Sequence, residues 1–191
     1  MFFIGVDLGQ KQDFSAWAVV EPLGDTLWVR YLERARLGTP YSIVVDRVAD
    51  LAGGTWLARN SRIVVDATGV GAPVVEMLRR AGTGSTVTTV TITGGEKAHG
   101  TGETWNVPKK DLLGGLQVLL EQGRLMIHRK LKEAPVLARE LASIRQWTLA
   151  GGRLGMGAEG AHQHDDLAMA VALGCWRAQR RTIGFGTQRL L

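Results

Sequence analysis

Two short apolar segments, each ending in an aspartate, place the strongest constraint on the fold of this chain. Residues 2–7 have the sequence FFIGVD and residues 62–66 have the sequence RIVVD. A nearly uninterrupted apolar run of this length is typical of a strand that is buried on both faces of a sheet. We therefore expect a central sheet in which Asp7 and Asp66 lie at the ends of two strands.

The rest of the pattern predicts how this sheet is completed. Residues 14–21 and 26–33 indicate two more strands, joined by the turn PLGD, which makes an antiparallel unit of three strands. Beyond residue 40 the apolar period lengthens to three and four residues, and helices alternate with strands. The predicted strands are 62–68, 85–93 and 124–128, and the predicted helices are 41–52, 69–82, 108–123, 131–147 and 165–179. This order predicts an α/β fold with a mixed central sheet, three antiparallel strands and then parallel strands, flanked by helices.

Glycine-rich segments predict the irregular parts. Residues 94–106 contain four glycines and no apolar period, so we expect a long, mobile loop there. Residues 148–156 indicate a hairpin with glycines at its tip. We expect one domain over residues 1–180 and a basic, flexible tail over 181–191.

The net charge and the cysteine content limit the kinds of partner and metal site that this chain can have. The chain has 23 Lys and Arg against 18 Asp and Glu, a formal charge of +5, and a pI of about 9.8. Such a charge favours a polyanion such as nucleic acid. Cys175 is the single cysteine, which excludes an intrachain disulfide and a zinc site built on cysteines. No signal peptide or membrane-spanning run is present, so we expect a cytoplasmic protein without a membrane partner.

A third acidic position precedes the last predicted helix, where HQHDD covers residues 162–166. A helix packed across the ends of two adjacent strands would bring Asp165 and Asp166 beside Asp7 and Asp66. Clustered carboxylates repel one another unless a cation compensates, and carboxylate oxygens suit Mg²⁺ or Mn²⁺. Each aspartate alone could instead begin a turn or cap a helix. His164 could donate to a carboxylate or a phosphate as a supporting group, or lie exposed in a loop.

Basic residues supply candidates for contacts to a phosphate backbone. Lys109 and Lys110 follow the glycine-rich segment and begin a predicted helix. Further candidates for this role are Lys97, Arg129, Lys130 and Lys132. Any one of them could also be an ordinary surface charge, but together they account for the basic pI.

Five stretches of the chain, in order between residues 4 and 176, resemble the C-terminal nuclease domain of phage terminase large subunits. They are GVDLG, VVDATGVGAPVVEMLRR, NVPKKDLLGGLQVLLEQGRLMI, APVLARELASI and HDDLAMAVALGCW. The resemblance implies the ribonuclease H-like fold, which retroviral integrases and RuvC-type resolvases share. It also implies metal-dependent endonucleolytic cutting of concatemeric viral DNA during genome packaging.

The family's motif implies catalytic, metal-binding carboxylates at Asp7, Asp66 and the doublet Asp165–Asp166. Asp166 is favoured as the direct ligand and Asp165 as a shared or supporting partner. The implied cofactors are two Mg²⁺ or Mn²⁺ ions and no nucleotide, and the implied substrate is double-stranded DNA, cut with little sequence preference. The implied setting is the host cytoplasm, with the terminase ATPase motor, the small terminase subunit and the portal as partners.

The chain departs from a complete large terminase in one respect, because no stretch matches G-x-x-x-x-G-K-[ST]. We therefore expect no ATPase domain, and neither ATP hydrolysis nor DNA translocation by this chain alone. Two other functions remain open, namely a RuvC-like Holliday junction resolvase and a non-catalytic DNA-binding packaging module. A sugar-kinase or actin-like ATPase is disfavoured because it needs a second such half.

Overall fold

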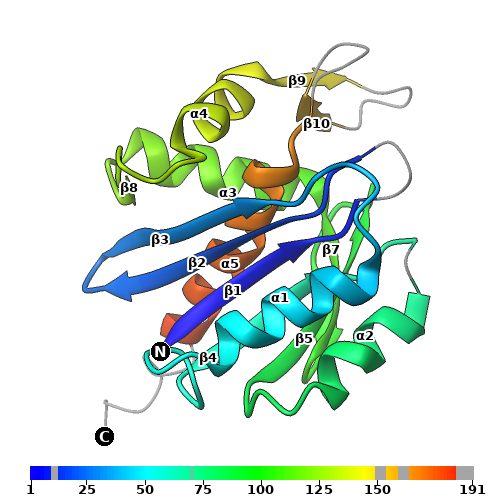
Figure 1. Ribbon diagram of the computed structural model, residues 1–191. Helices are drawn as coiled ribbons and strands as arrows, with labels where there is room; N and C mark the ends of the chain where they lie inside the picture. Colours follow the sequence, from blue (N-terminus) through cyan, green and yellow to red (C-terminus); the bar gives the residue numbers. More distant parts are fainter. Residues whose placement is uncertain (10–12, 70, 149–153, 159–163, 184–191) are drawn as a thin grey trace, which may run out of the picture.

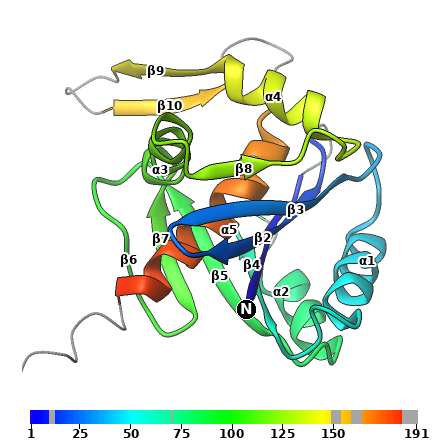
Figure 2. The ribbon, with the colours of Figure 1, turned by 90° about the vertical axis from the view of Figure 1, so that its left-hand side faces the viewer.

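The computed structural model describes residues 1–9, 13–69, 71–148, 154–158 and 164–183. Its centre is an eight-stranded mixed sheet with strand order β6-β7-β5-β4-β1-β2-β3-β8. Figures 1 and 2 show helices α1 and α2 on one face of this sheet and α5 with α3 on the other. The strands are β1 (Phe2–Asp7), β2 (Ala16–Leu23), β3 (Thr26–Arg34), β4 (Ser61–Asp66), β5 (Thr86–Thr93), β6 (His99–Thr101), β7 (Thr104–Pro108) and β8 (Leu125–Ile127).

The predicted strand pairing is confirmed at the centre of the sheet. Strands β1, β2 and β3 form the antiparallel unit, and β1 pairs in parallel with β4. The apolar residues of both central strands are buried because their alternate side chains enter two different cores. Phe3 packs in the core beneath α5, whereas Ile4 and Val6 pack in the core beneath α1 and α2.

The helices are α1 (Tyr41–Gly53), α2 (Gly71–Arg80), α3 (Lys109–Glu121), α4 (Ala134–Ser143) and α5 (Asp166–Ile183). Helix α5 is buried on nearly all sides from Leu167 to Trp176 because it lies between the sheet and helices α3 and α4. It continues beyond the predicted end at residue 179. Residues 184–191 of the predicted tail lie outside the described part of the chain. No helix within the described residues has both the length and the apolar character of a membrane span.

A close backbone contact fixes α5 against β1. A methyl group at Gly5 would overlap the carbonyl of Ala170, and one at Gly174 would come within 2.9 Å of Val20 Cγ2. Glycine at these two positions therefore lets the helix lie directly on the strand. The start of α5 is thereby held beside the end of β1.

The prediction of a long loop over residues 94–106 is wrong. This segment contains β6 and the start of β7, which pair with each other, and β7 also pairs in parallel with β5. Strands β6 and β7 are short and have glycines nearby, so the alternation of apolar and polar residues is too brief to be recognised in the sequence. Pairing with β5 stabilises them instead, and the carbonyl of Glu103 accepts hydrogen bonds from the backbone N–H and the hydroxyl of Thr89 at this junction.

The predicted helix over residues 131–147 is too long at both ends. Helix α4 stops at Ser143, and β9 (Ile144–Thr148) begins immediately and pairs antiparallel with β10 (Leu154–Ala158). The predicted hairpin is therefore present, but its first strand starts four residues earlier than expected. Its glycine-rich tip, residues 149–153, lies outside the described residues.

Candidate metal centre

The ends of β1 and β4 open into a pocket of about 450 Å³. Because these strands are parallel neighbours, with Val6 opposite Val65, the aspartates that end them lie side by side. The start of α5 adds the second pair of aspartates. The structure thus brings Asp7, Asp66, Asp165 and Asp166 together in the lining of one pocket.

Burial and mutual repulsion disfavour ionisation of this group. Burial raises the pKa of Asp7 well above its ordinary value, and the charges of Asp66, Asp166 and Asp165 raise it further. Burial also raises the pKa of Asp66, although hydrogen bonds from Thr68 oppose this shift. The pKa of Asp166 rises to about 6, first because of burial and against the opposing charge of His164. The pocket therefore concentrates negative charge that lacks sufficient compensation.

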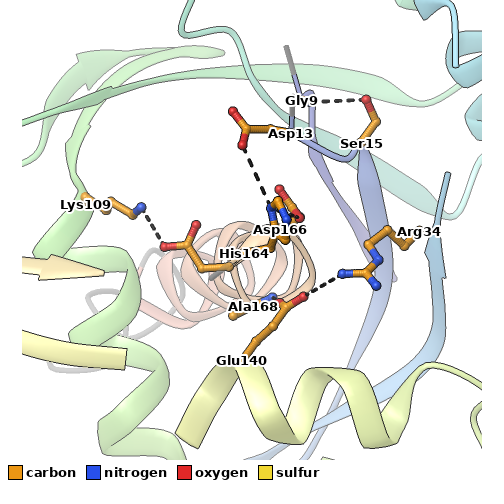
Figure 3. A network of polar contacts seen from close by, with 10 residues as sticks. Gly9, Asp13, Ser15, Arg34, Lys109, Glu140, His164, Asp166 and Ala168 are labelled. Carbon is orange, nitrogen blue, oxygen red and sulfur yellow. Dashed lines mark hydrogen bonds and ion pairs between the residues drawn. The ribbon is translucent and has the colours of Figure 1, made fainter. Parts of the chain in front are cut away.

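The two adjacent aspartates have different surroundings. Asp165 Oδ2 lies 2.6 Å from the Nζ atom of Lys109. Asp166 is only 5% exposed. The Oδ2 atoms of both aspartates are buried and accept no hydrogen bond among the described residues, but only that of Asp165 has a lysine ammonium beside it. The Nδ1 atom of His164 is 3.7 Å from Asp166 Oδ2. Figure 3 shows Lys109 and His164 approaching the start of α5 from opposite sides.

These residues fit a hard divalent cation. The donors are carboxylate oxygens, which Mg²⁺ and Mn²⁺ prefer, and a buried carboxylate oxygen without a partner is costly unless something positive binds it. Among the described residues, no three Asp, Glu, His or Cys side chains lie in positions from which they could hold one metal ion. Binding would therefore require the carboxylates to reorient, with Asp7, Asp66 and Asp166 as the main donors and Asp165 beside them.

His164 lies in the pocket lining beside the doublet, with its side chain 32% exposed. Its ring packs edge-on against Phe14 at a centroid distance of 4.9 Å, and its Nδ1 atom is 3.9 Å from Asp13 Oδ1. Phe14 is in turn covered by the guanidinium of Arg34 at 4.3 Å. Aromatic packing thus holds the imidazole next to Asp166.

Sequence reasoning missed Glu140, which holds the start of α5 from the side of α4 (Figure 3). Its Oε2 atom accepts a hydrogen bond of 2.9 Å from the backbone N–H of Ala168, and its Oε1 atom is 3.4 Å from Arg34 Nη1. Burial raises the pKa of Glu140 to about 7. The available signal was a charged residue one helical turn from buried Leu137, on the apolar face of an amphipathic helix.

The six basic candidates are dispersed. Lys109 lines the pocket, whereas Lys110 pairs with Glu96 at 2.7 Å outside the pocket lining. The other four do not line it, namely Lys97, Arg129, Lys130 and Lys132. The last three follow β8, which pairs with β3 at the sheet edge, on the far side of β2 and β3 from β1. A role for these residues in DNA binding remains a prediction.

Substitutions at Glu140 should separate its hydrogen bond from its charge. Glu140→Ala removes the acceptor for the Ala168 N–H group, so the free energy of unfolding should fall by about 1–3 kcal/mol. Glu140→Gln keeps an acceptor oxygen and should retain most of that stability. Urea unfolding, together with hydrogen exchange of the Ala168 amide, measures both effects. An equal loss of unfolding free energy in Glu140→Ala and Glu140→Gln would show that the negative charge of Glu140 stabilises the fold, and not its hydrogen bond from Ala168.

The stability of the metal-free protein should fall as pH rises from about 4.5 to about 7. The folded protein raises the pKa of Asp166 from 3.8 to about 6 and of Glu140 from 4.5 to about 7, so it binds more protons than the unfolded chain in this range. We expect the melting temperature in EDTA to drop by about 5 °C across it. Asp166→Asn should flatten the lower part of this profile. A melting temperature that rises with pH through the same range would contradict the raised pKa values of Asp166 and Glu140.

Comparison with known proteins identifies the family to which this fold belongs. Residues 4–174 match the family model of the terminase RNaseH-like domain. The large terminase nuclease from thermophilic phage G20c is 25% identical, with a TM-score of 0.68, over 91% of this chain and 80% of that chain. The nuclease domain of the Thermus phage P74-26 large terminase is 24% identical, with a TM-score of 0.64, over 91% of this chain and 77% of that one.

A longer relative places the same fold within a larger chain. The large terminase of bacteriophage HK97 is 15% identical, with a TM-score of 0.60, and the match covers 91% of this chain but 38% of that chain. Comparison with curated protein sequences gives no match. The family match covers nearly all of the sequence, and the mixed sheet is the ribonuclease H-like fold. The chain therefore belongs to the family of terminase RNase H-like domains.

Proposed function

We propose that this chain is a metal-dependent DNA endonuclease of the kind that cuts concatemeric phage DNA during genome packaging. The observation that carries the proposal is the meeting of Asp7 and Asp66, from adjacent parallel strands, with the buried carboxylate of Asp166 in one open pocket of the described structure. The Oδ2 atom of Asp166 accepts no hydrogen bond among the described residues. Such a pocket suits divalent ions that act on a phosphodiester. Family membership supports the same reaction class.

Structures of relatives support the choice of cofactor. The G20c large terminase nuclease has been solved with bound magnesium and with bound cobalt, and the SPP1 nuclease domain with bound manganese. We propose that this chain binds two Mg²⁺ or Mn²⁺ ions. When bound, such ions would supply activation of a water molecule for attack on phosphorus and stabilisation of the leaving oxygen.

The chain's own residues would divide the remaining work. Asp7, at the end of the central strand β1, would bind the ions together with Asp66 at the end of the neighbouring strand β4. Asp66 and Asp166 would each hold one side of the site. His164, held by Phe14, is placed to donate a hydrogen bond to Asp166 or to a substrate phosphate. The rigid contact between α5 and β1 keeps these carboxylates in a common frame.

The proposed substrate is double-stranded DNA, bound mainly through its phosphates and therefore with little sequence preference. The proposed partners are an ATPase motor, the small terminase subunit and the portal. The HK97 match covers 38% of that large terminase, so that chain contains further segments beside the part that shares this fold.

Cleavage assays test the proposal and its alternatives together. Supercoiled plasmid, linear duplex and a four-way junction should each be incubated with Mg²⁺, Mn²⁺ or EDTA. We expect plasmid and linear duplex to be cut only when a divalent ion is present. Exclusive, symmetric cutting of the junction would instead indicate a resolvase. DNA binding without cleavage in any metal would indicate a non-catalytic packaging module.

A further inference from the structure

Lys109 occupies an unusual place for a lysine at the start of a helix. It is the first residue of α3 and directly follows the end of β7, and its side chain turns into the acidic pocket. Its ammonium lies 2.6 Å from Asp165 Oδ2, well within the 4 Å that defines an ion pair. Lys109 therefore directs its ammonium at the carboxylates, while its side chain stays 37% exposed to solvent.

The surroundings of this ion pair restrain it. Gly157 of β10 lies above it, such that a methyl group there would stand 3.5 Å from Lys109 Nζ and 3.7 Å from Asp165 Oδ2. The same methyl group would stand 3.3 Å from the ring of Trp147 on β9. The pair is thus packed beneath the hairpin, and the side chain of Asp165 is only 18% exposed.

No other lysine or arginine among the described residues lines this pocket. The charge of Lys109 also acts on Asp7 and Asp66, which places the ammonium within the field of the whole cluster. A fixed positive charge at this position offsets the repulsion among the aspartates when no divalent ion is bound. The same positive charge repels an incoming divalent ion and so opposes its binding.

We propose that Lys109 is the built-in counter-ion of this site, and that a divalent ion must displace its ammonium from Asp165 in order to bind. The inference rests on the proposed function, because it assumes that the pocket binds divalent ions. It assigns Lys109 a different role from a contact to DNA phosphate. It predicts that this residue sets metal affinity in the absence of DNA.

Manganese binding to the DNA-free protein tests the proposal, with free Mn²⁺ measured by electron paramagnetic resonance. Lys109→Met keeps the aliphatic stem and removes the charge, so it should bind Mn²⁺ about tenfold more tightly than the wild type. Its melting temperature in EDTA should fall, and Mn²⁺ should restore it. Lys109→Arg keeps the charge and should bind Mn²⁺ with nearly wild-type affinity.

Lys110→Met is the matched control, because Lys110 pairs with the largely exposed Glu96 outside the pocket lining. It should leave both the Mn²⁺ affinity and the melting temperature in EDTA almost unchanged. Unchanged Mn²⁺ affinity in Lys109→Met, with weaker DNA binding, would overturn the proposal in favour of a phosphate contact. Weaker Mn²⁺ binding would overturn it in favour of Lys109 aligning Asp165 as a ligand.

The same experiment tests the metal site and the role of Lys109 separately. If the wild type binds Mn²⁺ and Asp7→Asn abolishes that binding, the proposed metal site stands whatever Lys109→Met does. If the wild type binds no Mn²⁺, or Asp7→Asn binds it equally well, the proposed function fails and the role of Lys109 fails with it.

Discussion

Asp7→Asn should abolish DNA cleavage in Mg²⁺ or Mn²⁺ and raise the melting temperature of the metal-free protein. The amide preserves the shape of the side chain but is a poor ligand for a hard cation, so the rate should fall by at least about a thousandfold. The melting temperature should rise by about 2–5 °C in EDTA because burial and three neighbouring carboxylates raise the pKa of Asp7, and its ionised form is costly. Plasmid cleavage and thermal unfolding in EDTA measure the two effects.

Asp46→Asn is a suitable control for this experiment. Asp46 lies exposed on α1, which covers the opposite face of the sheet from α5, and it does not line the pocket. The control should cut DNA at the wild-type rate and melt at the wild-type temperature. Wild-type cleavage by Asp7→Asn itself would remove Asp7 from the metal site.

Asp166→Ala and Asp165→Ala should differ sharply in consequence, although the residues are adjacent. Asp166 is buried with an unpartnered oxygen, so its loss should eliminate cleavage and barely change the melting temperature. Asp165 is paired with Lys109, so its loss should weaken metal binding or lower stability, and high Mn²⁺ should recover some activity. Residue 166 begins α5, and the loss of an acidic side chain from this first turn costs only about 0.3–1 kcal/mol.

The decisive measurement is the cleavage rate of each single variant as a function of Mn²⁺ concentration. For Asp165→Ala we expect a curve shifted to higher Mn²⁺, and for Asp166→Ala no measurable cleavage at any concentration. Two curves close to that of the wild type would reduce the doublet to a helix cap and remove the start of α5 from the proposed site.

The strands at the centre of the sheet were predictable because burial on both faces leaves a local mark. Residues 2–7 and 61–66 each contain an apolar run that ends at an aspartate, and that property is visible without knowledge of their neighbours. Strands β7 and β9 carry no comparable mark. Each is stabilised by pairing, β7 with the distant β5 and β9 with β10, so residues 94–106 and 144–147 were assigned wrongly.

The candidate site divides in the same way. The four aspartates could be named from the sequence because each ends a recognisable strand or precedes a recognisable helix. Glu140 could not be named, because its partners Arg34 and Ala168 are 106 and 28 residues away. The contact between Lys109 and Asp165 likewise joins the starts of two helices that meet only after folding.

The sequence by itself determined that this protein has a mixed sheet with aspartates at the ends of its central strands, since hydrophobic periodicity and strand ends are local properties. It also carried the family motif over nearly the whole chain. Only the tertiary structure decided that Asp165 has a lysine ammonium beside it, whereas Asp166 has an imidazole nitrogen 3.7 Å away. That difference depends on how α3, α4 and α5 pack around the pocket, and the electrostatics of a buried group are set by all the neighbours that folding brings within a few ångströms.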